Sequence, residues 1–164
     1  MVNERQLSMI QNKIKTCAFT GHRNLGDDFS VKELEKQIQE VIKKGVEIFY
    51  NGMAMGFDLL AAERVLYIKR KFPNIKLIAC VPFYGQEKSF KETDKKRYAK
   101  ILKKADEVVI LSEKYYKGCL HERNRYMAER GDILLAYCKQ ESGGTAYTVK
   151  YFKKNFPERE IIFL

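Results

Sequence analysis

The stretch from Ile48 to Leu60, which reads I-F-Y-N-G-M-A-M-G-F-D-L-L, most constrains the fold of this chain. Its β-branched and aromatic start predicts a buried strand, and a small-residue loop with two glycines follows. Asp58 then stands at the start of a pattern that predicts a helix to about Lys71. A strand that turns through glycines into a helix points unpaired backbone N–H groups at one place. The stretch is therefore a candidate phosphate site, or alternatively a βα turn whose glycines serve geometry alone.

Length and composition indicate one globular domain over residues 1–164. Hydrophobic residues make up 45% and charged residues 32% of the chain, which is typical of a protein with an ordinary core. No apolar run approaches the roughly 20 residues of a membrane helix. The polar segment 1–13 lacks a signal-peptide pattern, and we expect it to be frayed or to form a short leading helix.

These features predict a cytoplasmic protein without a membrane partner. Its four cysteines are then expected to be reduced thiols. Neither their spacing nor the two histidines resembles a metal-binding motif, so no metal site is expected.

The net charge of +10 has two interpretations. It is either the footprint of a polyanion such as nucleic acid, or a solvated lysine-rich surface that keeps the protein in solution. The lysines are scattered along predicted helix faces, with one dense run from Lys88 to Lys104. Both interpretations allow attraction of a small phosphorylated ligand.

Strand and helix patterns alternate along the chain, with no hairpin signal and no repeat. Ser30 and Glu33 form a capping-box pair before one helix, and Gly45 follows its end. The expected strands are 15–20, 46–50, 75–81, 107–111, 133–138 and 160–163. The expected helices start near residues 31, 57, 94, 121 and 144. This order predicts an α/β fold, a three-layer α/β/α sandwich around a mostly parallel sheet.

Ligands of such sheets bind beyond the carboxyl ends of the strands, where the strand order reverses. The candidate site residues are therefore those that follow each predicted strand, and most of them are glycines or polar residues. They are Gly21, His22, Arg23, Gly52, Met53, Ala54, Met55, Gly56, Asp58, Pro82, Gln86, Ser112, Gly143, Gly144 and Thr145. Three glycine-bearing loops that converge on one edge favour an anion site more than any one loop does.

Several of these residues have two interpretations. Gly52 to Gly56 would hold a phosphate with backbone N–H groups. Asp58 would accept a hydrogen bond from a ribose hydroxyl or a base, or would instead cap its own helix. Arg23 would pair with a phosphate, or would form a surface salt bridge. His22 is expected to orient the ligand rather than to catalyse, because no acid partner or nucleophile motif accompanies it.

The fourth helix and two carboxylates supply further candidates. Arg123 and Asn124, near the start of that helix, would line the pocket with polar groups or serve helix packing. Glu63 and Glu122 are the nearest spare carboxylates. Either carboxylate would be the acid or base of a hydrolase, and Glu63 and His22 are the catalytic candidates. Three loop tyrosines would stack on a base or pack against the fold, namely Tyr84, Tyr115 and Tyr116.

Four motifs together resemble the YoqJ/YpsA-like branch of the SLOG superfamily. They are C-A-F-T-G-H-R (Cys17–Arg23), N-G-M-A-M-G-F-D-L-L-A-A-E (Asn51–Glu63), R-N-R-Y-M (Arg123–Met127) and G-G-T-A-Y-T-V (Gly143–Val149). The resemblance extends from about Lys15 to the end of the chain. It implies a Rossmann-like fold and a nucleotide or nucleotide-derived ligand, such as an ADP-ribose-like molecule or a cyclic nucleotide. Relatives include LOG-type phosphoribohydrolases and DNA-processing protein A. Some members come from prophages, and related folds form homo-oligomers.

One departure from the resembled pattern bears on catalysis. LOG-type enzymes carry P-G-G-x-G-T-x-x-E, whose glutamate contributes to N-glycosidic cleavage. Gly144 and Thr145 match the G-T of that pattern, but Tyr147 and Thr148 stand where the acids would be, and neither supplies a carboxylate. A binding module for sensing or sequestration is therefore favoured. The alternatives are a hydrolase of nucleotide N-glycosidic or phosphate bonds and a single-stranded DNA-binding protein.

Overall fold

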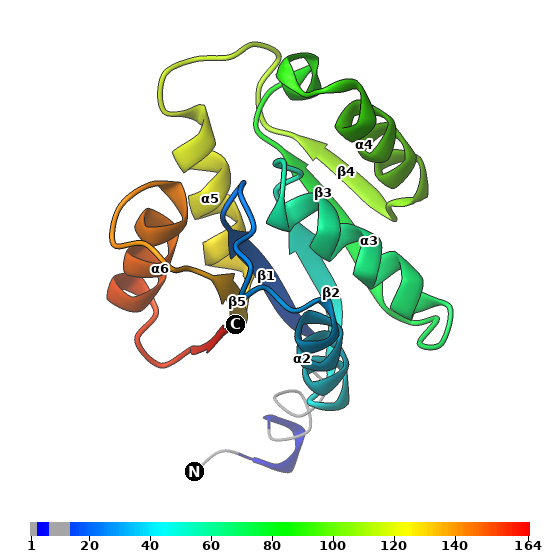
Figure 1. Ribbon diagram of the computed structural model, residues 1–164. Coiled ribbons are helices and arrows are strands. Elements are labelled where there is room, and N and C mark those ends of the chain that lie inside the picture. Colours follow the sequence, from blue (N-terminus) through cyan, green and yellow to red (C-terminus); the bar gives the residue numbers. More distant parts are fainter. Residues whose placement is uncertain (1–2, 7–13) are drawn as a thin grey trace.

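The computed structural model describes residues 3–6 and 14–164, so the expectation for segment 1–13 lies mostly outside the described residues. Within them, six strands form one sheet in the order β4-β3-β2-β1-β5-β6, and every neighbouring pair is parallel (Figure 1). The strands are β1 (Lys15–Gly21), β2 (Val46–Asn51), β3 (Lys76–Val81), β4 (Glu107–Ile110), β5 (Ile133–Tyr137) and β6 (Glu160–Phe163). The order reverses at β1, because β2 and β5 flank it on opposite sides.

Helices cover both faces of the sheet, so the predicted three-layer sandwich is confirmed. One face packs against α2 (Val31–Lys43), α3 (Phe57–Lys69) and α4 (Glu92–Lys104). The other face packs against α5 (Cys119–Arg130) and α6 (Gly144–Asn155). The sheet is parallel throughout, whereas the sequence predicted a mostly parallel one.

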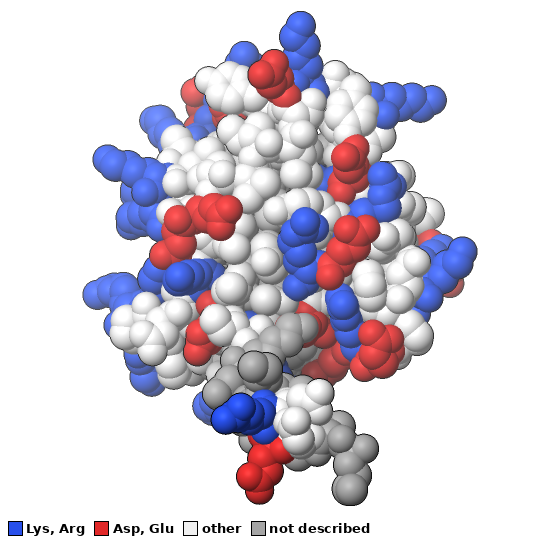
Figure 2. Space-filling view, turned by 180° about the vertical axis from the view of Figure 1, so that it is seen from behind, with Lys and Arg blue, Asp and Glu red and all other residues white. Residues whose placement is uncertain are grey.

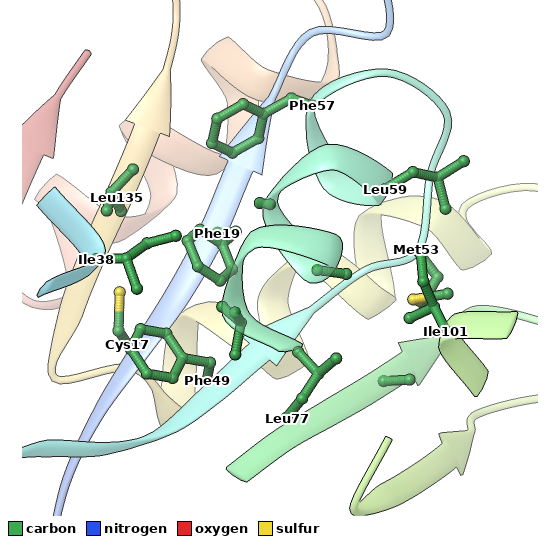
Figure 3. Close-up of a cluster of buried hydrophobic side chains, with 14 of the residues drawn as sticks. Cys17, Phe19, Ile38, Phe49, Met53, Phe57, Leu59, Leu77, Ile101 and Leu135 are labelled. Atoms are coloured by element: carbon green, nitrogen blue, oxygen red, sulfur yellow. The ribbon is translucent and has the colours of Figure 1, made fainter. Parts of the chain in front are cut away.

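The two faces have separate hydrophobic cores, and β1 contributes to both. Cys17 and Phe19 point into the core beneath α2–α4, whereas Ala18 between them points to α5 and α6. This is the two-residue period of a strand buried on both sides. Figure 3 shows Phe19, Phe49 and other side chains of the first core interleaved between sheet and helices. Each fully buried large side chain contributes about 1.5–3 kcal/mol to folding.

The predicted ends of α2 are confirmed. The Ser30 side-chain oxygen accepts a hydrogen bond from the Glu33 N–H at 3.1 Å. Gly45 follows the helix with φ 101°, the left-handed conformation that glycine adopts without strain. The Glu33 carboxylate, expected to complete the capping box with Ser30, instead accepts from Gln37 Nε2 at 2.8 Å.

Some element boundaries differ from the sequence-based expectation. Helix α5 begins at Cys119, two residues early, because Gly118 ends the preceding loop with φ 98°. The short 3-10 helix η1 (Gln86–Ser89) lies between the expected strand 75–81 and the helix expected near residue 94, where the sequence predicted neither element. Helix α3 ends at Lys69 rather than near Lys71, ahead of Pro73.

The face shown in Figure 2 agrees with the solvated interpretation of the net charge. On the face shown in Figure 2, Lys and Arg side chains are interspersed with Asp and Glu rather than gathered in one basic patch. In the part of the chain that the structure describes, no helix has the length and apolarity needed to span a membrane. The four cysteines are free thiols, and Cys17, Cys80 and Cys119 are buried.

Gly21 provides a test of the packing at the end of β1. A Cβ there would lie 2.2 Å from Cγ of the buried Phe57 side chain, so we expect Gly21→Ala to displace that ring. Overpacking of this kind costs about 1–3 kcal/mol. Gly144→Ala is the matched control, because its nearest neighbour would be Asn124 Nδ2 at 4.0 Å. Urea unfolding should show a lower midpoint for Gly21→Ala only, and equal midpoints would contradict this packing.

Candidate functional site

A cavity of about 340 Å³ lies beyond the carboxyl end of β1, where the strand order reverses. Four segments meet there: the end of β1 with its turn, the β2–α3 turn, the start of α5, and the loop into α6. The lining residues are Phe19, Thr20, Gly21, His22, Arg23, Ala54, Asp58, Leu120, His121, Arg123, Asn124, Gln140, Ser142, Gly143, Gly144 and Thr145. This is the position at which parallel α/β sheets bind their ligands.

The start of α6 presents backbone N–H groups to this cavity. Gly143 precedes the helix with φ 96°, and no side chain caps the helix. The first turn contains no acidic residue. Tyr147 N–H donates to the Gly143 carbonyl at 2.9 Å, which leaves the N–H groups ahead of it without a helical partner. Since Gly143, Gly144 and Thr145 line the cavity, these groups and the helix dipole favour an anion there.

The turn between β2 and α3 uses its own backbone N–H groups internally. Met53 N–H donates to Asn51 Oδ1 at 2.8 Å, and Ala54 N–H donates to Asp58 Oδ2 at 3.2 Å. Asn51 Nδ2 also donates to the Asp58 carbonyl at 2.8 Å. The N–H groups of Met53 and Ala54 are therefore engaged within the turn, and of the five residues expected to hold a phosphate only Ala54 lines the cavity. Asp58 holds the turn through Ala54 N–H, but it does not cap its own helix, whose N-cap residue is Gly56 and which has no side-chain cap.

Close packing explains the two glycines of this turn. A Cβ on Gly52 would lie 3.0 Å from Arg123 Cζ and 2.9 Å from Asp58 Oδ2. Gly56 has φ 76°, and a Cβ there would lie 2.0 Å from the Arg23 carbonyl oxygen. Backbone and side chains of the protein itself, rather than a ligand, therefore occupy the space that these glycines leave open.

A buried cation and a buried carboxyl group form the floor of the cavity. Arg123 and Asp58 are only 5% and 6% exposed. The Arg123 guanidinium donates to the Gly52 carbonyl and, through Nε, to Asn124 Oδ1 at 2.9 Å. Burial raises the pKa of Asp58 to about 6, while the Arg123 charge opposes the shift. Burial lowers the pKa of Arg123 and the Asp58 carboxylate opposes that change. Arginine nevertheless stays protonated, because its ordinary pKa exceeds 12.

His22 joins two loops at the mouth of the cavity. Its Nε2 accepts a hydrogen bond from Lys139 N–H at 2.7 Å, and its ring meets the edge of Tyr137 with centroids 5.5 Å apart. Burial lowers the pKa of His22, which agrees with an unprotonated Nε2. This geometry fits an orienting role. The neighbouring Arg23 is exposed and lines the cavity.

Comparison with known proteins places the chain in a family. The YpsA model, described as the YspA SLOG family, matches residues 27–162. A UPF0398 protein of Halalkalibacterium halodurans is 33% identical over 136 residues, which is 81% of this chain and 72% of that protein. The chain belongs to the YpsA SLOG family.

Two solved structures share the fold of this YpsA-family chain. DNA processing protein A from Streptococcus pneumoniae has a TM-score of 0.66 and 20% identity, over 92% of this chain and 50% of that protein. This chain thus spans half of that longer protein. DNA processing protein A from Helicobacter pylori, whose structure is described in terms of its single-stranded DNA binding mode, has a TM-score of 0.66 and 17% identity. The match covers 95% of this chain and 67% of that protein. At these identities the likeness shows the Rossmann-like fold alone.

Several predicted site residues of the YpsA-family chain lie away from the cavity. Pro82 and Ser112 follow β3 and β4, which lie beyond β2 from the reversal point. The Ser112 hydroxyl donates to the Lys114 carbonyl at 2.7 Å within its own turn. Gln86 Nε2 donates to the Met53 carbonyl at 3.2 Å, so Gln86 supports the β2–α3 turn from behind. Neighbouring strand ends therefore do not contribute equally to the site.

Met53 and Met55 also have packing roles. The Met53 side chain is fully buried and lies near Ile101 in the first core (Figure 3), and Met55 packs against that core. Met55 also lines a neighbouring cavity. Met53 has φ 59°, the one left-handed residue other than glycine among the described residues. Its conformation follows from the tight turn that Asn51 closes.

The carboxylate candidates lie outside the cavity. Glu63 projects between α3 and α4, where its Oε1 accepts from Arg97 Nε at 2.6 Å. Glu122 accepts a hydrogen bond from the Tyr116 hydroxyl. Tyr84, Tyr115 and Tyr116 are 68%, 63% and 42% exposed, and none of them lines the cavity. Asp58 is therefore the carboxyl group that the structure places at the site.

Sequence reasoning missed part of the lining. The missed residues include Thr20, Gln140 and Ser142. They lie within or beside the motifs quoted above, so their position next to predicted site residues could have indicated them. His121 gave no signal as an isolated histidine. Its ring stacks on Tyr147 with centroids 4.1 Å apart and an interplanar angle of 8°. Among the described residues, no three His, Cys, Asp or Glu side chains gather in a way that would hold a metal ion.

Asp58 makes folding stability depend on pH. Its folded-state pKa of about 6 exceeds the ordinary 3.8, so the folded protein retains a proton that the unfolded chain releases. The contribution of Asp58 to the free energy of unfolding is therefore greatest below pH 3.8 and is lost as the pH rises through 6. The loss amounts to about 3 kcal/mol at most.

Asp58→Asn keeps an acceptor for Ala54 N–H but cannot titrate. We expect the unfolding free energy of the wild type, relative to this variant, to fall between about pH 4 and pH 6.5 and then to level off. Urea titrations across this range measure the difference. A constant difference at every pH would contradict a raised pKa for Asp58.

Proposed function

We propose that this YpsA-family chain binds a nucleotide or nucleotide-derived molecule through a phosphate at the start of α6, for sensing or sequestration. The observation that carries the proposal is the uncapped amino end of α6, where Gly143, Gly144 and Thr145 open into the cavity. Two cations flank the same space, the exposed Arg23 and the buried Arg123. Helix N–H groups and guanidinium groups are both suited to phosphate.

The rest of the cavity suits the remainder of a nucleotide. Asn124 and Thr20 offer hydrogen-bonding groups for a ribose, and Asp58 adds a carboxyl group. The exposed His121 ring, stacked on Tyr147, supplies an aromatic surface for a base. The volume of about 340 Å³ lies at the lower end of the range for small-molecule sites. Membership of the SLOG family supports the same ligand class.

A binding role is preferred because the LOG-type catalytic position lacks an acid. Thr148 stands there, with its hydroxyl donating to the Gly144 carbonyl at 2.9 Å, and the neighbouring Tyr147 stacks on His121. Hydrolysis is the second candidate, and Asp58 favours it. A buried carboxyl group with a pKa of about 6 is matched to general acid or base work near neutral pH.

Product analysis after incubation with purine and pyrimidine nucleotides separates these two functions. Turnover that disappears in Asp58→Asn, while binding persists, would establish hydrolysis. If the nucleotides remain unchanged at saturating protein concentration, hydrolysis is excluded.

Single-stranded DNA is a third candidate, since the related H. pylori fold is described as binding it. A DNA strand would contact several phosphates, so its affinity would fall steeply with salt. A mononucleotide in the cavity would show a much weaker dependence. Titration with oligothymidylate at two salt concentrations therefore distinguishes a strand-binding surface from a nucleotide pocket.

Gly144→Asp is the sharpest test of the phosphate site. A carboxylate in the first turn of a helix is compatible with folding, because it complements the helix dipole. The same charge would repel a phosphate, so we expect ADP to lose its stabilising effect. Wild-type protein with a Kd of about 0.1 mM should gain about 1.4 kcal/mol at about 1 mM ADP, or about 3–5 °C in Tm.

The control for this test is Gly144→Asn, which has nearly the same shape without the charge. It should retain more of the ADP-dependent rise in Tm than Gly144→Asp does. If no nucleotide raises the Tm of the wild type, or if ADP stabilises Gly144→Asp as much as the wild type, phosphate binding at α6 is wrong.

A further inference from the structure

A second cavity, of about 470 Å³, adjoins the first one and shares Arg23 with it. Its lining combines cations with an apolar wall. Arg23, Lys91 and Arg97 supply positive charge, Asp94 adds a buried carboxylate, and Leu25 and Met55 supply the apolar surface. No residue of the candidate nucleotide site other than Arg23 lines both cavities.

The cations of the second cavity differ in how they are engaged. Arg97 is held between two carboxylates, with Asp94 at 3.0 Å and Glu63 at 2.6 Å from its nitrogen atoms. Among residues 3–6 and 14–164, neither Arg23 nor Lys91 forms an ion pair. Two positive charges on the rim are therefore not neutralised by a carboxylate contact, and a phosphate is the group that complements them.

The position of Arg23 between the cavities is fixed by its backbone. Its carbonyl oxygen packs so closely on Gly56 that a Cβ there would lie 2.0 Å away. Phe57 N–H also donates to the His22 carbonyl at 3.1 Å, which joins the β1 turn to the start of α3. The exposed guanidinium therefore extends from a fixed backbone position that borders both spaces.

We infer that the natural ligand is a dinucleotide, with two nucleoside units joined through phosphate, and that it occupies both cavities. One phosphate lies at the start of α6, and a second lies between Arg23 and Lys91. The base of the second unit packs against Leu25 and Met55, since an apolar wall suits the face of a base. The inference rests on the proposed function and deepens it, because it names the class of ligand.

Calorimetric titration with two probes tests this inference: AMP, and the 5′-phosphorylated dinucleotide of adenosine. The dinucleotide should bind at least about tenfold more tightly than AMP, because it adds a charge-assisted contact and a buried base. Lys91→Gln should remove most of that advantage and leave AMP affinity unchanged. The Lys91 side chain makes no capping hydrogen bond to α4, so the fold is expected to tolerate this change.

Lys100→Gln is the matched control, since Lys100 is an exposed lysine in the groove between α3 and α4 rather than in either cavity. It should leave both affinities unchanged. If AMP binds and the dinucleotide gains nothing, or if Lys91→Gln weakens both probes equally, the second subsite is wrong while the proposed function stands. If neither probe binds, the proposed function and this inference both fail.

Discussion

The burial of the Arg123 guanidinium is the constraint on which the carboxyl edge of the sheet depends. An isolated charge in this position would be costly, because it loses its hydration. The Gly52 carbonyl and the Asn124 side chain accept its hydrogen bonds, and the Asp58 carboxyl group lies beside it. Helix α5 is thereby held to the β2–α3 turn across the end of the sheet. The cavity floor is thus made of groups that stabilise one another.

As a result, the two glycine-bearing turns at this edge of the sheet differ in how their backbone N–H groups are used. In the β2–α3 turn, Met53 and Ala54 N–H donate to Asn51 and Asp58, and the glycines make room for Arg123 and Arg23. The β5–α6 turn is open, since added Cβ atoms on Gly143 would meet nothing within 4 Å and the helix has no side-chain cap. The N–H groups of the β5–α6 turn are therefore the ones that remain available for the proposed phosphate.

Local sequence patterns predicted the fold well, because each pattern reports a local preference. The alternation of elements, the Ser30 cap and the Gly45 terminus all depend on neighbouring residues, and all are confirmed. Strand order is not local. The sequence therefore could not show that the ends of β3 and β4, with Pro82 and Ser112, lie apart from the reversal at β1.

The site was predicted less completely for a similar reason. Asn51 and Asp58 accept hydrogen bonds from Met53 and Ala54 N–H in their own turn, and only the folded geometry shows these contacts. His121 was missed because its contribution depends on the stack with Tyr147, which lies on a different helix. Homo-oligomer formation stays a prediction.

The most direct measurement of anion binding at α6 is an amide NMR titration of the isotope-labelled protein with AMP. Saturable shifts should centre on the N–H signals of Gly143, Gly144 and Thr145, while those of Met53 and Ala54 change far less because their hydrogen bonds are internal. Shifts centred on the β2–α3 turn, or on the groove between α3 and α4, would contradict an anion site at the start of α6.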